Sequence, residues 1–484
     1  MRAPAKHPRK HPPKKPPQGP GTPGAGQIQV WEDDPEPAVL VSAAQPNPAK
    51  RPLGYKFPSP APAPSSDTHS AAFRYWVAAE ALRRGADFWA PQVASGKWQP
   101  GADLKVLLDE GEDLNAYYDR QALNFFHGAG PSGTVYSGAS PDILCHEMGH
   151  AILDSIKPQL WGAASQEAAA FHESFGDMSA ILSALQLPSL RVAVLRDTNN
   201  HLNRDSRLSR LAEELGTAIR AQFPDAVDAD SLRNAVNSFN YSNPQTLPSR
   251  APASQLSSES HSFSRVFTGA FFDALAGMLA AHAATPGAPS ADELRDVSLQ
   301  MRDILIKGVL QAPVVSDFYA QVAAGMVQAS AAADANYPAV LKGVFVRRAI
   351  LSLESAASVQ TLHFAAAAAV GMPKEAAQPL DRLALPAAHY GLSEPLIVEA
   401  PSQPRQFAAF AATHNAKSAE PASAISAATS FVDELFANGR VDYNKMGGEA
   451  GMHASHRLKT HTLVRDGKSL RLARRLFDCG ICGK

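Results

Sequence analysis

Two histidines and a glutamate at residues 146–150 have the types and spacing of a metal-binding pair with a base beside it. The segment reads His-Glu-Met-Gly-His, so His146 and His150 stand four residues apart. On a helix this spacing puts both imidazoles on one face, where they can bind one zinc ion. Glu147 is turned about 100° around the helix and can face the position that zinc leaves for water. The pentapeptide also occurs as two histidines that merely pack in a helix.

A second segment repeats the four-residue spacing with two acids, Glu173 and Asp177. One carboxylate can bind the metal while the other supports a ligand histidine from behind. This Ala-rich segment begins near Ser165 and ends before Pro188, and a short link joins it to the first segment. Helices connected in this way tend to pack antiparallel. Burying these polar groups without a cation is costly, so the pair of segments predicts a metal site.

The elements around these segments predict a mixed α+β fold. A helical period starts at Asp67-Thr68 and ends at Gly85, and the pattern then changes to alternation. The expected strands of this small sheet lie at 104–108, 115–118 and 123–126. After the motif, helices are expected near 204–222, 261–284, 290–311, 315–333 and 337–357.

Both ends of the chain differ in composition from the centre. Residues 1–66 are rich in Pro and Gly, which predicts a disordered basic tail in which only residues 27–31 form an edge strand. The region from 373 is broken by prolines and contains an expected strand at 396–398 and a hairpin at 460–472. We therefore expect four parts: a tail (1–66), a β-rich half (67–140), a helical half with the metal site (141–372) and an appended segment of unknown role (373–484).

Composition limits the class of protein. The formal net charge is −1, which gives no reason to expect nucleic acid as a partner. Three cysteines are too few for a secreted disulfide framework, and no apolar run has the length of a membrane span or a signal peptide. We expect a cytoplasmic protein that does not bind a membrane.

These residues resemble those of the thermolysin-like branch of the gluzincin zinc metallopeptidases. The resemblance rests on HEMGH, on HESFGD downstream, on Asn115-Ala116 and on His261 in SESHSFSRVFTGAFFDAL, and it covers roughly residues 67–357. It implies a β-rich N-terminal part and a helical C-terminal part with the cleft between them. The roles it implies are metal ligands (His146, His150, Glu173), general base (Glu147), support of a ligand imidazole (Asp177), pairing with a peptide strand (Asn115, Ala116) and hydrogen bonding to the oxyanion (His261).

The chain departs from this family in its oxyanion support. The family places a tyrosine between the two metal segments, but no Tyr occurs between His150 and Glu173. Either His261 works with another donor or catalysis is slow. Arg233 stands where an arginine could grip the substrate carbonyl, and a surface arginine is the alternative. Asp142 matches a calcium-binding position of some relatives, but few acids accompany it, so we expect no paired calcium site and a helix-capping role.

The remaining candidates have plainer interpretations. We expect Cys145 to be a buried core thiol. Cys479 and Cys482 form a CxxC pair, which could bind metal or form a redox couple, but a mobile tail is the default because no second pair of ligands is evident. His172 is either a structural histidine or a hydrogen-bond partner near the site.

The sequence therefore predicts a zinc metalloendopeptidase that hydrolyses a peptide or protein substrate with a water activated by Glu147. It does not predict an oligomeric state. The alternative is a catalytically weak protein in which zinc holds the helices together and another surface binds a partner. A third possibility is a self-processing or toxin-like peptidase that loses its Pro-rich tail.

Overall fold

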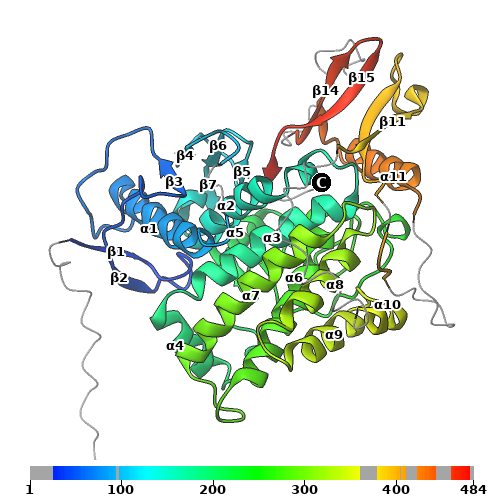
Figure 1. Cartoon of the computed structure of the whole chain (residues 1–484). Helices are drawn as coiled ribbons and strands as arrows, with labels where there is room; N and C mark the ends of the chain where they lie inside the picture. Colours follow the sequence, from blue (N-terminus) through cyan, green and yellow to red (C-terminus); the bar gives the residue numbers. More distant parts are fainter. Residues whose placement is uncertain are drawn as a thin grey trace, which may run out of the picture.

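The fold is of the α+β class, with a central body of helices and two separate sheets. The computed structural model describes residues 26–93, 98–359, 379–403, 405–409, 422–442 and 459–479. Figure 1 shows the helices in the centre, the N-terminal strands on one side of them and the C-terminal sheet projecting on the other. The first sheet borders the helix that carries HEMGH, and the second sheet contacts the segment after this helix through a bridge between Ala163 and Glu399.

The helices agree with most of the ranges that the sequence predicts. They are α1 (Ala71–Trp89), α2 (Pro141–Ile156), α3 (Gln166–Ala184), α4 (Pro188–Asp197), α5 (Glu213–Gln222), α6 (Ser260–His282), α7 (Ala291–Gln311), α8 (Phe318–Ser330), α9 (Tyr337–Arg347), α10 (Leu353–Ser358) and α11 (Ala424–Ala437). Two expectations were too long. The segment expected at 204–222 is helical only from Glu213, after Ala212 with φ 53°, and that expected at 337–357 is broken near Ala349 with φ 58°. A left-handed residue cannot continue a helix.

A five-stranded sheet borders the metal helix, and four of its strands precede this helix in the sequence. Its order is β16-β5-β6-β4-β3, with β3 (Gly54–Lys56), β4 (Asp103–Leu107), β5 (Ala116–Tyr118), β6 (Ala122–Phe125) and β16 (Phe477–Asp478). The predicted strands at 104–108, 115–118 and 123–126 are thereby confirmed within a residue or two. The edge strand β16 comes from the far end of the chain and pairs antiparallel with β5. In Figure 1 it is the red arrow beside β5.

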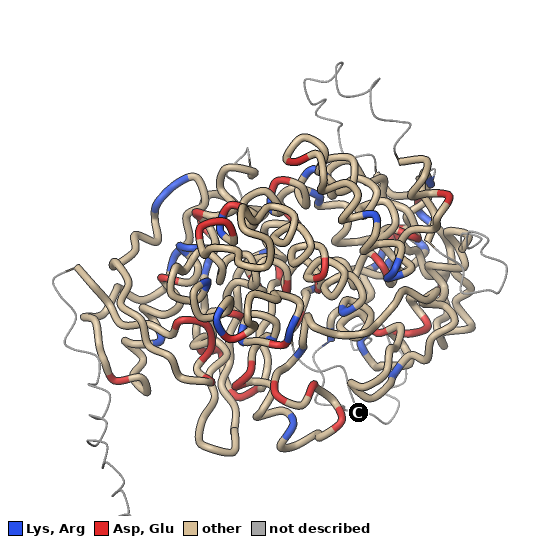
Figure 2. The backbone as a smooth tube through the Cα atoms, turned by 90° about the horizontal axis from the view of Figure 1, so that it is seen from below, with Lys and Arg blue, Asp and Glu red and all other residues tan. Residues whose placement is uncertain are grey.

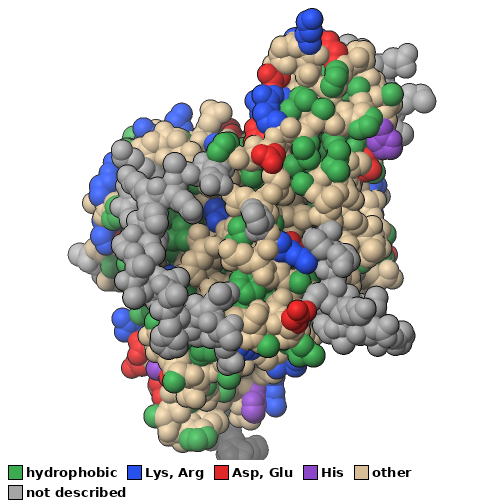
Figure 3. All heavy atoms as spheres, turned by 45° about the vertical axis from the view of Figure 1, so that its right-hand side comes forward, with side chains coloured by type: hydrophobic (Ala, Val, Ile, Leu, Met, Phe, Trp, Pro, Cys, Tyr) green, Lys and Arg blue, Asp and Glu red, His purple; other side chains and the backbone are tan. Residues whose placement is uncertain are grey.

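The C-terminal region forms a second five-stranded sheet with its own core. The order is β11-β12-β15-β14-β13, with β11 (Asp381–Leu385), β12 (Leu396–Ala400), β13 (Val441–Asp442), β14 (His461–Asp466) and β15 (Ser469–Arg474). The predicted strand at 396–398 and the hairpin around Asp466-Gly467 are confirmed. Helix α11 packs on this sheet, and Ala164 and Ala169 complete its core from the helical body. In Figure 3 hydrophobic side chains gather over this projecting part.

The remaining strands form three short pairs. They are β1 (Gln27–Trp31) with β2 (Leu40–Ala44), β7 (His127–Gly130) with β8 (Gly133–Tyr136), and β9 (Arg210–Leu211) with β10 (Arg233–Asn234). The β9–β10 pair draws Arg233 toward the metal helix.

The expectation that residues 1–66 form a disordered tail is wrong for the part that the structure describes. Residues 26–56 contain β1, β2 and β3, and Ile28, Val30, Leu53 and Tyr55 are fully or almost fully buried in the main core. The run at 27–31, predicted as an edge strand, is β1, and it pairs with β2 in a local hairpin. The sequence did not indicate β2 or β3, and β3 pairs with β4, which lies far away in the chain.

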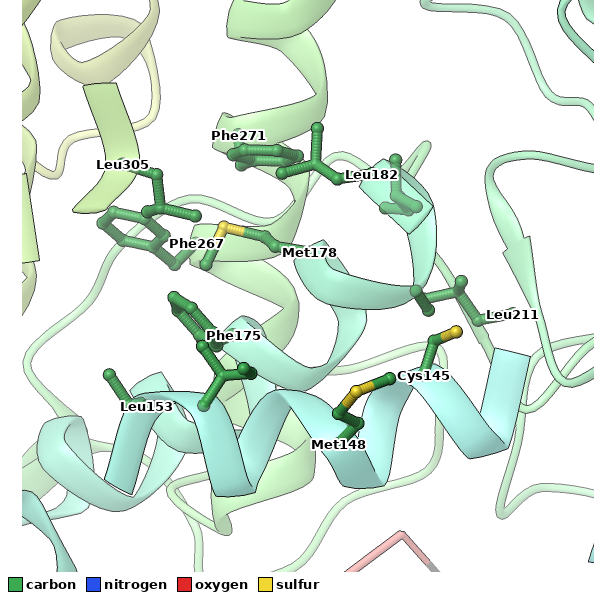
Figure 4. Close-up of a cluster of buried hydrophobic side chains, with 14 of the residues drawn as sticks. Cys145, Met148, Leu153, Phe175, Met178, Leu182, Leu211, Phe267, Phe271 and Leu305 are labelled. Atoms are coloured by element: carbon green, nitrogen blue, oxygen red, sulfur yellow. The ribbon is translucent and has the colours of Figure 1, made fainter. Parts of the chain in front are cut away.

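The main hydrophobic core lies beneath the two metal helices. In Figure 4, Cys145 and Met148 of α2 face Phe175 and Met178 of α3, and Phe267 of α6 closes the layer. These side chains are almost wholly buried, with exposed fractions of 1% or less. Each helix thus has one face in this apolar layer and another at the polar site.

Helix α6 is the one helix of the described chain that is long and apolar enough to cross a membrane. However, 78% of its apolar window is buried inside the protein, as for a core helix. In the backbone tube of Figure 2, the Lys and Arg positions (blue) and the Asp and Glu positions (red) are interspersed along the chain.

Candidate metal centre

The metal helices begin and end where their local sequence dictates. Ser140 caps α2 by accepting a hydrogen bond from the Ile143 amide, and Pro141 follows at the first helical position. Ser165 caps α3 in the same way. Between them, α2 ends before Pro158 and a single 3-10 turn (Pro158–Trp161) reverses the chain. The short reversal places the two helices side by side.

Two glycines allow α2 and α3 to approach at the level of the metal residues. A Cβ on Gly149 would lie 2.9 Å from the Gly176 Cα and 3.1 Å from the Phe175 carbonyl oxygen. A Cβ on Gly176 would lie 2.6 Å from two atoms of the His146 ring. These distances are shorter than ordinary contact, so only glycine fits at either position. The single glycines of HEMGH and HESFGD therefore set the spacing between the helices.

The side chains of His146, Glu147 and His150 form a buried group that could bind a metal ion. Each offers one ligand atom, and these atoms lie within 4.8 Å of one another. The Glu173 carboxylate joins them, because its Oε2 lies 3.4 Å from His146 Nε2 and 3.8 Å from His150 Nε2. Ligand atoms about 2.1 Å from a tetrahedral zinc stand about 3.4 Å apart. The two imidazoles and Glu173 thus have the separations of a ligand set.

The polar atoms at this point lack ordinary partners. Neither oxygen of Glu147, neither Nε2 of the two histidines, nor Oε2 of Glu173 makes a regular hydrogen bond within the described part of the chain. All four residues are 3% exposed or less. Buried polar groups without partners are costly and rare, and an absent ion is a standard reason for them. The residues present therefore fit a metal ion.

Asp177 and Arg233 fix the orientation of His146. The Asp177 Oδ1 lies 3.0 Å from His146 Nδ1, which leaves Nε2 to face the candidate metal position. Arg233 donates to the same carboxylate from Nε at 3.1 Å and from a terminal nitrogen at 2.8 Å. Both partners of this ion pair are buried. Arg233 is thus held by Asp177 beside the site, and is not a surface arginine.

The pKa values describe a site without its metal. Burial lowers the pKa of His146, but the neighbouring carboxylates of Asp177 and Glu173 outweigh this effect and raise it to about 9. Burial raises the pKa of Glu147 to about 8. Burial would also raise the pKa of Asp177, yet Arg233 and His146 lower it to about 2. A metal at this point would displace the proton from His146, so its affinity must rise with pH.

His261 and the Asn115-Ala116 pair are buried close to the metal residues. His261 Nε2 lies 3.4 Å from Glu173 Oε2, and Nδ1 lies 2.7 Å from Glu259. Asn115 accepts a hydrogen bond from the Ala116 amide through its side chain at 2.9 Å, and Ala116 begins β5. The structure therefore brings all the sequence-predicted residues of the site to one place.

The strand residues Phe477–Cys479, near the C-terminal end of the chain, also lie at the candidate metal site. The amide of Cys479 donates to the Ala116 carbonyl at 3.0 Å, and His261 Nε2 forms a short hydrogen bond with the Asp478 carbonyl. Phe477 stacks on His172 and His150 with ring centroids 4.0 Å and 5.1 Å away. The expectation that Cys479 belongs to a mobile tail is therefore wrong, since this residue is 1% exposed. Cys482 lies outside the described residues.

The other sequence candidates have clear places. Cys145 is buried, as expected, and its thiol contacts the Ala81 carbonyl oxygen at 3.5 Å. His172 packs against Phe477, and neither ring nitrogen has a hydrogen-bond partner in the described chain, so its part here is packing. Sequence reasoning missed Phe477, Asp478 and Arg440, which pairs with Asp478 at 3.0 Å. No local pattern marks these residues, because their partners lie far away in the chain.

The helix-capping role expected for Asp142 is also wrong, because Ser140 caps α2. Asp142 accepts a hydrogen bond from the Ala212 amide at 3.1 Å. Asp34, from the N-terminal segment, accepts from the Ser140 hydroxyl at 2.5 Å and from the Glu214 amide at 2.9 Å. Burial and the neighbouring Asp33 and Asp34 raise the pKa of Asp142 well above its ordinary value. A set of buried acids thus ties the N-terminal segment to the start of the metal helix.

Comparison with known proteins adds no relative from which roles could be transferred. No known family model matches the chain, and no curated protein matches it significantly. The geometry and chemistry of the site carry the functional argument alone.

Proposed function

We propose that this protein is a zinc-dependent metallopeptidase of the thermolysin-like type, acting as an endopeptidase. The observation that carries the proposal is the convergence of two imidazoles, two carboxylates and a third histidine at one buried point beside a sheet edge. A site that only held helices together would need the ligands but not Glu147 or His261. The sheet edge at Ala116 supplies the backbone groups that an extended peptide can pair with.

Each residue of the chain has a distinct role in this mechanism. His146, His150 and Glu173 would hold the zinc, which supplies an acidic water nucleophile and polarises the scissile carbonyl. Glu147 accepts the proton of the attacking water and passes it to the leaving amine. His261 Nε2 donates a hydrogen bond to the carbonyl oxygen as that oxygen gains charge.

The supporting residues keep this geometry fixed. Asp177 holds the Nδ1 hydrogen of His146, and Arg233 keeps Asp177 ionised. Glu259 orients His261 through Nδ1, so that Nε2 faces the substrate position. No tyrosine stands between His150 and Glu173, so His261 is the proposed source of oxyanion support.

The test compares two glutamates that are similarly buried and have similarly raised pKa values but lie at different places in the protein. Glu147→Gln should leave about one zinc per chain but lower the hydrolysis of an unstructured fluorogenic peptide by about 10²–10⁴-fold, because the amide cannot accept the proton. Glu167→Gln is the control. Glu167 is equally buried and its pKa is likewise raised to about 8, but it bonds Tyr241 instead. Equal activity of the Glu147→Gln variant and the wild type would contradict the mechanism.

A catalytically weak zinc protein is the second candidate, and the covered cleft favours it. In that case zinc would raise the thermal stability, while neither the wild type nor Glu167→Gln would hydrolyse any peptide. Zinc content together with peptide hydrolysis separates the two functions.

A further inference from the structure

We propose that the strand Phe477–Cys479 occupies the substrate position of this site and inhibits the protein with its own chain. This inference rests on the proposed function, because an inhibitor needs a reaction to inhibit. Four contacts carry it, one from the backbone of the strand and three from its successive residues.

The backbone contact uses the sheet edge that a peptide substrate would need. β16 pairs antiparallel with β5, in the register Phe477 with Tyr118 and Asp478 with Tyr117. The Cys479 amide then extends the ladder to the Ala116 carbonyl. The opposite edge of β5 is already paired with β6. A strand has only two edges, so no peptide can pair with β5 while β16 is in place.

Asp478 places its carbonyl where the reaction needs one. His261, the proposed oxyanion donor, hydrogen-bonds this carbonyl oxygen through Nε2. The Asp478 side chain forms a buried ion pair with Arg440, in which both side chains are 5% exposed or less. Arg440 directly precedes β13 of the C-terminal sheet, so the ion pair anchors the strand to that sheet.

Phe477 covers the imidazoles of the metal helix and of α3. Its ring stacks on His172 and His150 at an interplanar angle of 19° in both cases, and Trp161 contacts it edge-on at 5.4 Å. The guanidinium of Arg474, the last residue of β15, lies 4.0 Å from the centroid of the Phe477 ring. With an exposed fraction of 2%, Phe477 is an aromatic anchor in a formed pocket.

Cys479 closes the small cavity on the other side of the metal residues. Its side chain lines this cavity with Ile143, His146, Leu232 and Arg233. The His146 side chain in this lining belongs to the proposed ligand set, so the cavity adjoins the metal position. The proposed base Glu147 is also buried, with an exposed fraction of 0%.

The tether makes this inhibition effective even if the strand binds weakly. Only Arg475 and Leu476 separate β15 from β16, and β15 belongs to a sheet with its own core. A segment held this close has an effective concentration in the millimolar range. Free peptides at micromolar concentration would compete poorly.

The first experiment removes one hydrogen bond from the strand in the full-length protein. Cys479→Pro eliminates the N–H that donates to Ala116, whereas Cys479→Ala loses the thiol but keeps the N–H. We expect kcat/KM for the fluorogenic peptide to rise about tenfold in Cys479→Pro relative to Cys479→Ala, at equal zinc content. Phe477→Ala should also raise it, because the aromatic anchor is lost. Equal or lower kcat/KM in both Cys479→Pro and Phe477→Ala would overturn the proposal.

The second experiment measures peptide binding to the cleft and does not depend on catalysis. In a Glu147→Gln background, a fluorescent peptide with the sequence of Arg474–Cys479 should bind the Phe477→Ala protein and not the protein with an intact strand. Binding to both or to neither would overturn the inhibitory role, whether or not any variant hydrolyses peptides. Absence of hydrolysis in all variants, with binding as expected, would instead contradict the proposed function alone.

A third experiment tests whether the strand is an inhibitor or a substrate of the site. The intact mass of the zinc-loaded wild type should stay constant during incubation. Loss of residues 479–484 would show that the chain cleaves its own Asp478–Cys479 bond, and would overturn the inhibitory role.

Discussion

The α2–α3 pair and the strand β16 meet at the same point, but they are specified in opposite ways. The helices derive their geometry from residues within about 40 positions of one another, namely caps, a short turn and two glycines. The strand Phe477–Cys479 has almost no local determinant and owes its place to Ala116, His150 and His261. One region of the site is encoded locally, and the other by complementarity to a finished surface.

The α2–α3 pair therefore forms the candidate metal site, and the strand Phe477–Cys479 covers it. A change in the local region should remove metal binding, whereas a change in the strand should alter access and leave the metal in place. The predictions below test this separation, starting with the largest expected effect.

Removing a ligand should have the largest effect. Glu173→Ala leaves two imidazoles, which cannot hold zinc tightly, so zinc affinity should fall by more than about a hundredfold, beyond the range for supporting residues. Cys479→Ala should leave the affinity within about threefold, because the thiol is not among the atoms grouped around the metal position. Competition with a chromophoric chelator measures both. A comparable loss in Cys479→Ala would make the thiol a ligand and break the separation.

Disturbing the distance between the helices should have an intermediate effect. Gly176→Ala places a methyl group against the His146 ring, so the ring or α3 must shift. We expect zinc affinity to fall about tenfold to a hundredfold and the free energy of unfolding to fall by about 1–3 kcal/mol.

Gly343→Ala is the matched control for this change. Gly343 also lies inside a helix, but its added Cβ would meet only the flexible end of Arg347 at 3.4 Å. Alanine there should be neutral or slightly stabilising. If Gly176→Ala binds zinc like Gly343→Ala, close packing of α2 and α3 does not position His146.

Local patterns made most of the fold predictable. HEMGH with HESFGD indicated two packed helices, the alternation at 104–126 indicated the sheet, and Asp466-Gly467 indicated the β14–β15 hairpin. The run at 27–31 was predicted as an edge strand and is β1, but β2, β3 and β16 were not predicted. They are two to five residues long, and β3 and β16 pair with strands that lie far away in the chain. Short strands have too few residues for a periodicity, so only the folded surface selects them.

A change in the docked N-terminal segment should have the smallest effect, and it should appear as a change in how stability depends on pH. Burial, together with Asp34 and despite Arg84 and Arg207, raises the pKa of Asp33 to about 7. The folded state then binds more protons than the unfolded state, so this contribution is complete below pH 4 and is lost as pH rises toward 7. Asp33→Asn should remove it and stabilise the metal-free protein near pH 7 by at least about 1.4 kcal/mol relative to wild type.

Urea unfolding in chelator at several pH values measures this difference. The two proteins should have similar stability near pH 4 and diverge toward pH 7. Parallel curves across the range would mean that the docked segment does not hold a protonated Asp33. Groups that do not interact with Asp33, such as His146, are common to both proteins and cancel in the comparison, whereas the pKa of Asp142 falls when Asp33 is replaced and adds to the difference.

The distance in sequence between His261 and the strand has a consequence for biosynthesis. The two partners of the Asp478–His261 hydrogen bond are 217 residues apart. At a translation rate of about 5–20 residues per second, the ribosome needs roughly 10–40 s to go from one to the other. The residues that receive the strand are therefore synthesised well before the strand itself. Under the proposed inhibition, the protein would become latent only once Phe477–Cys479 has been made.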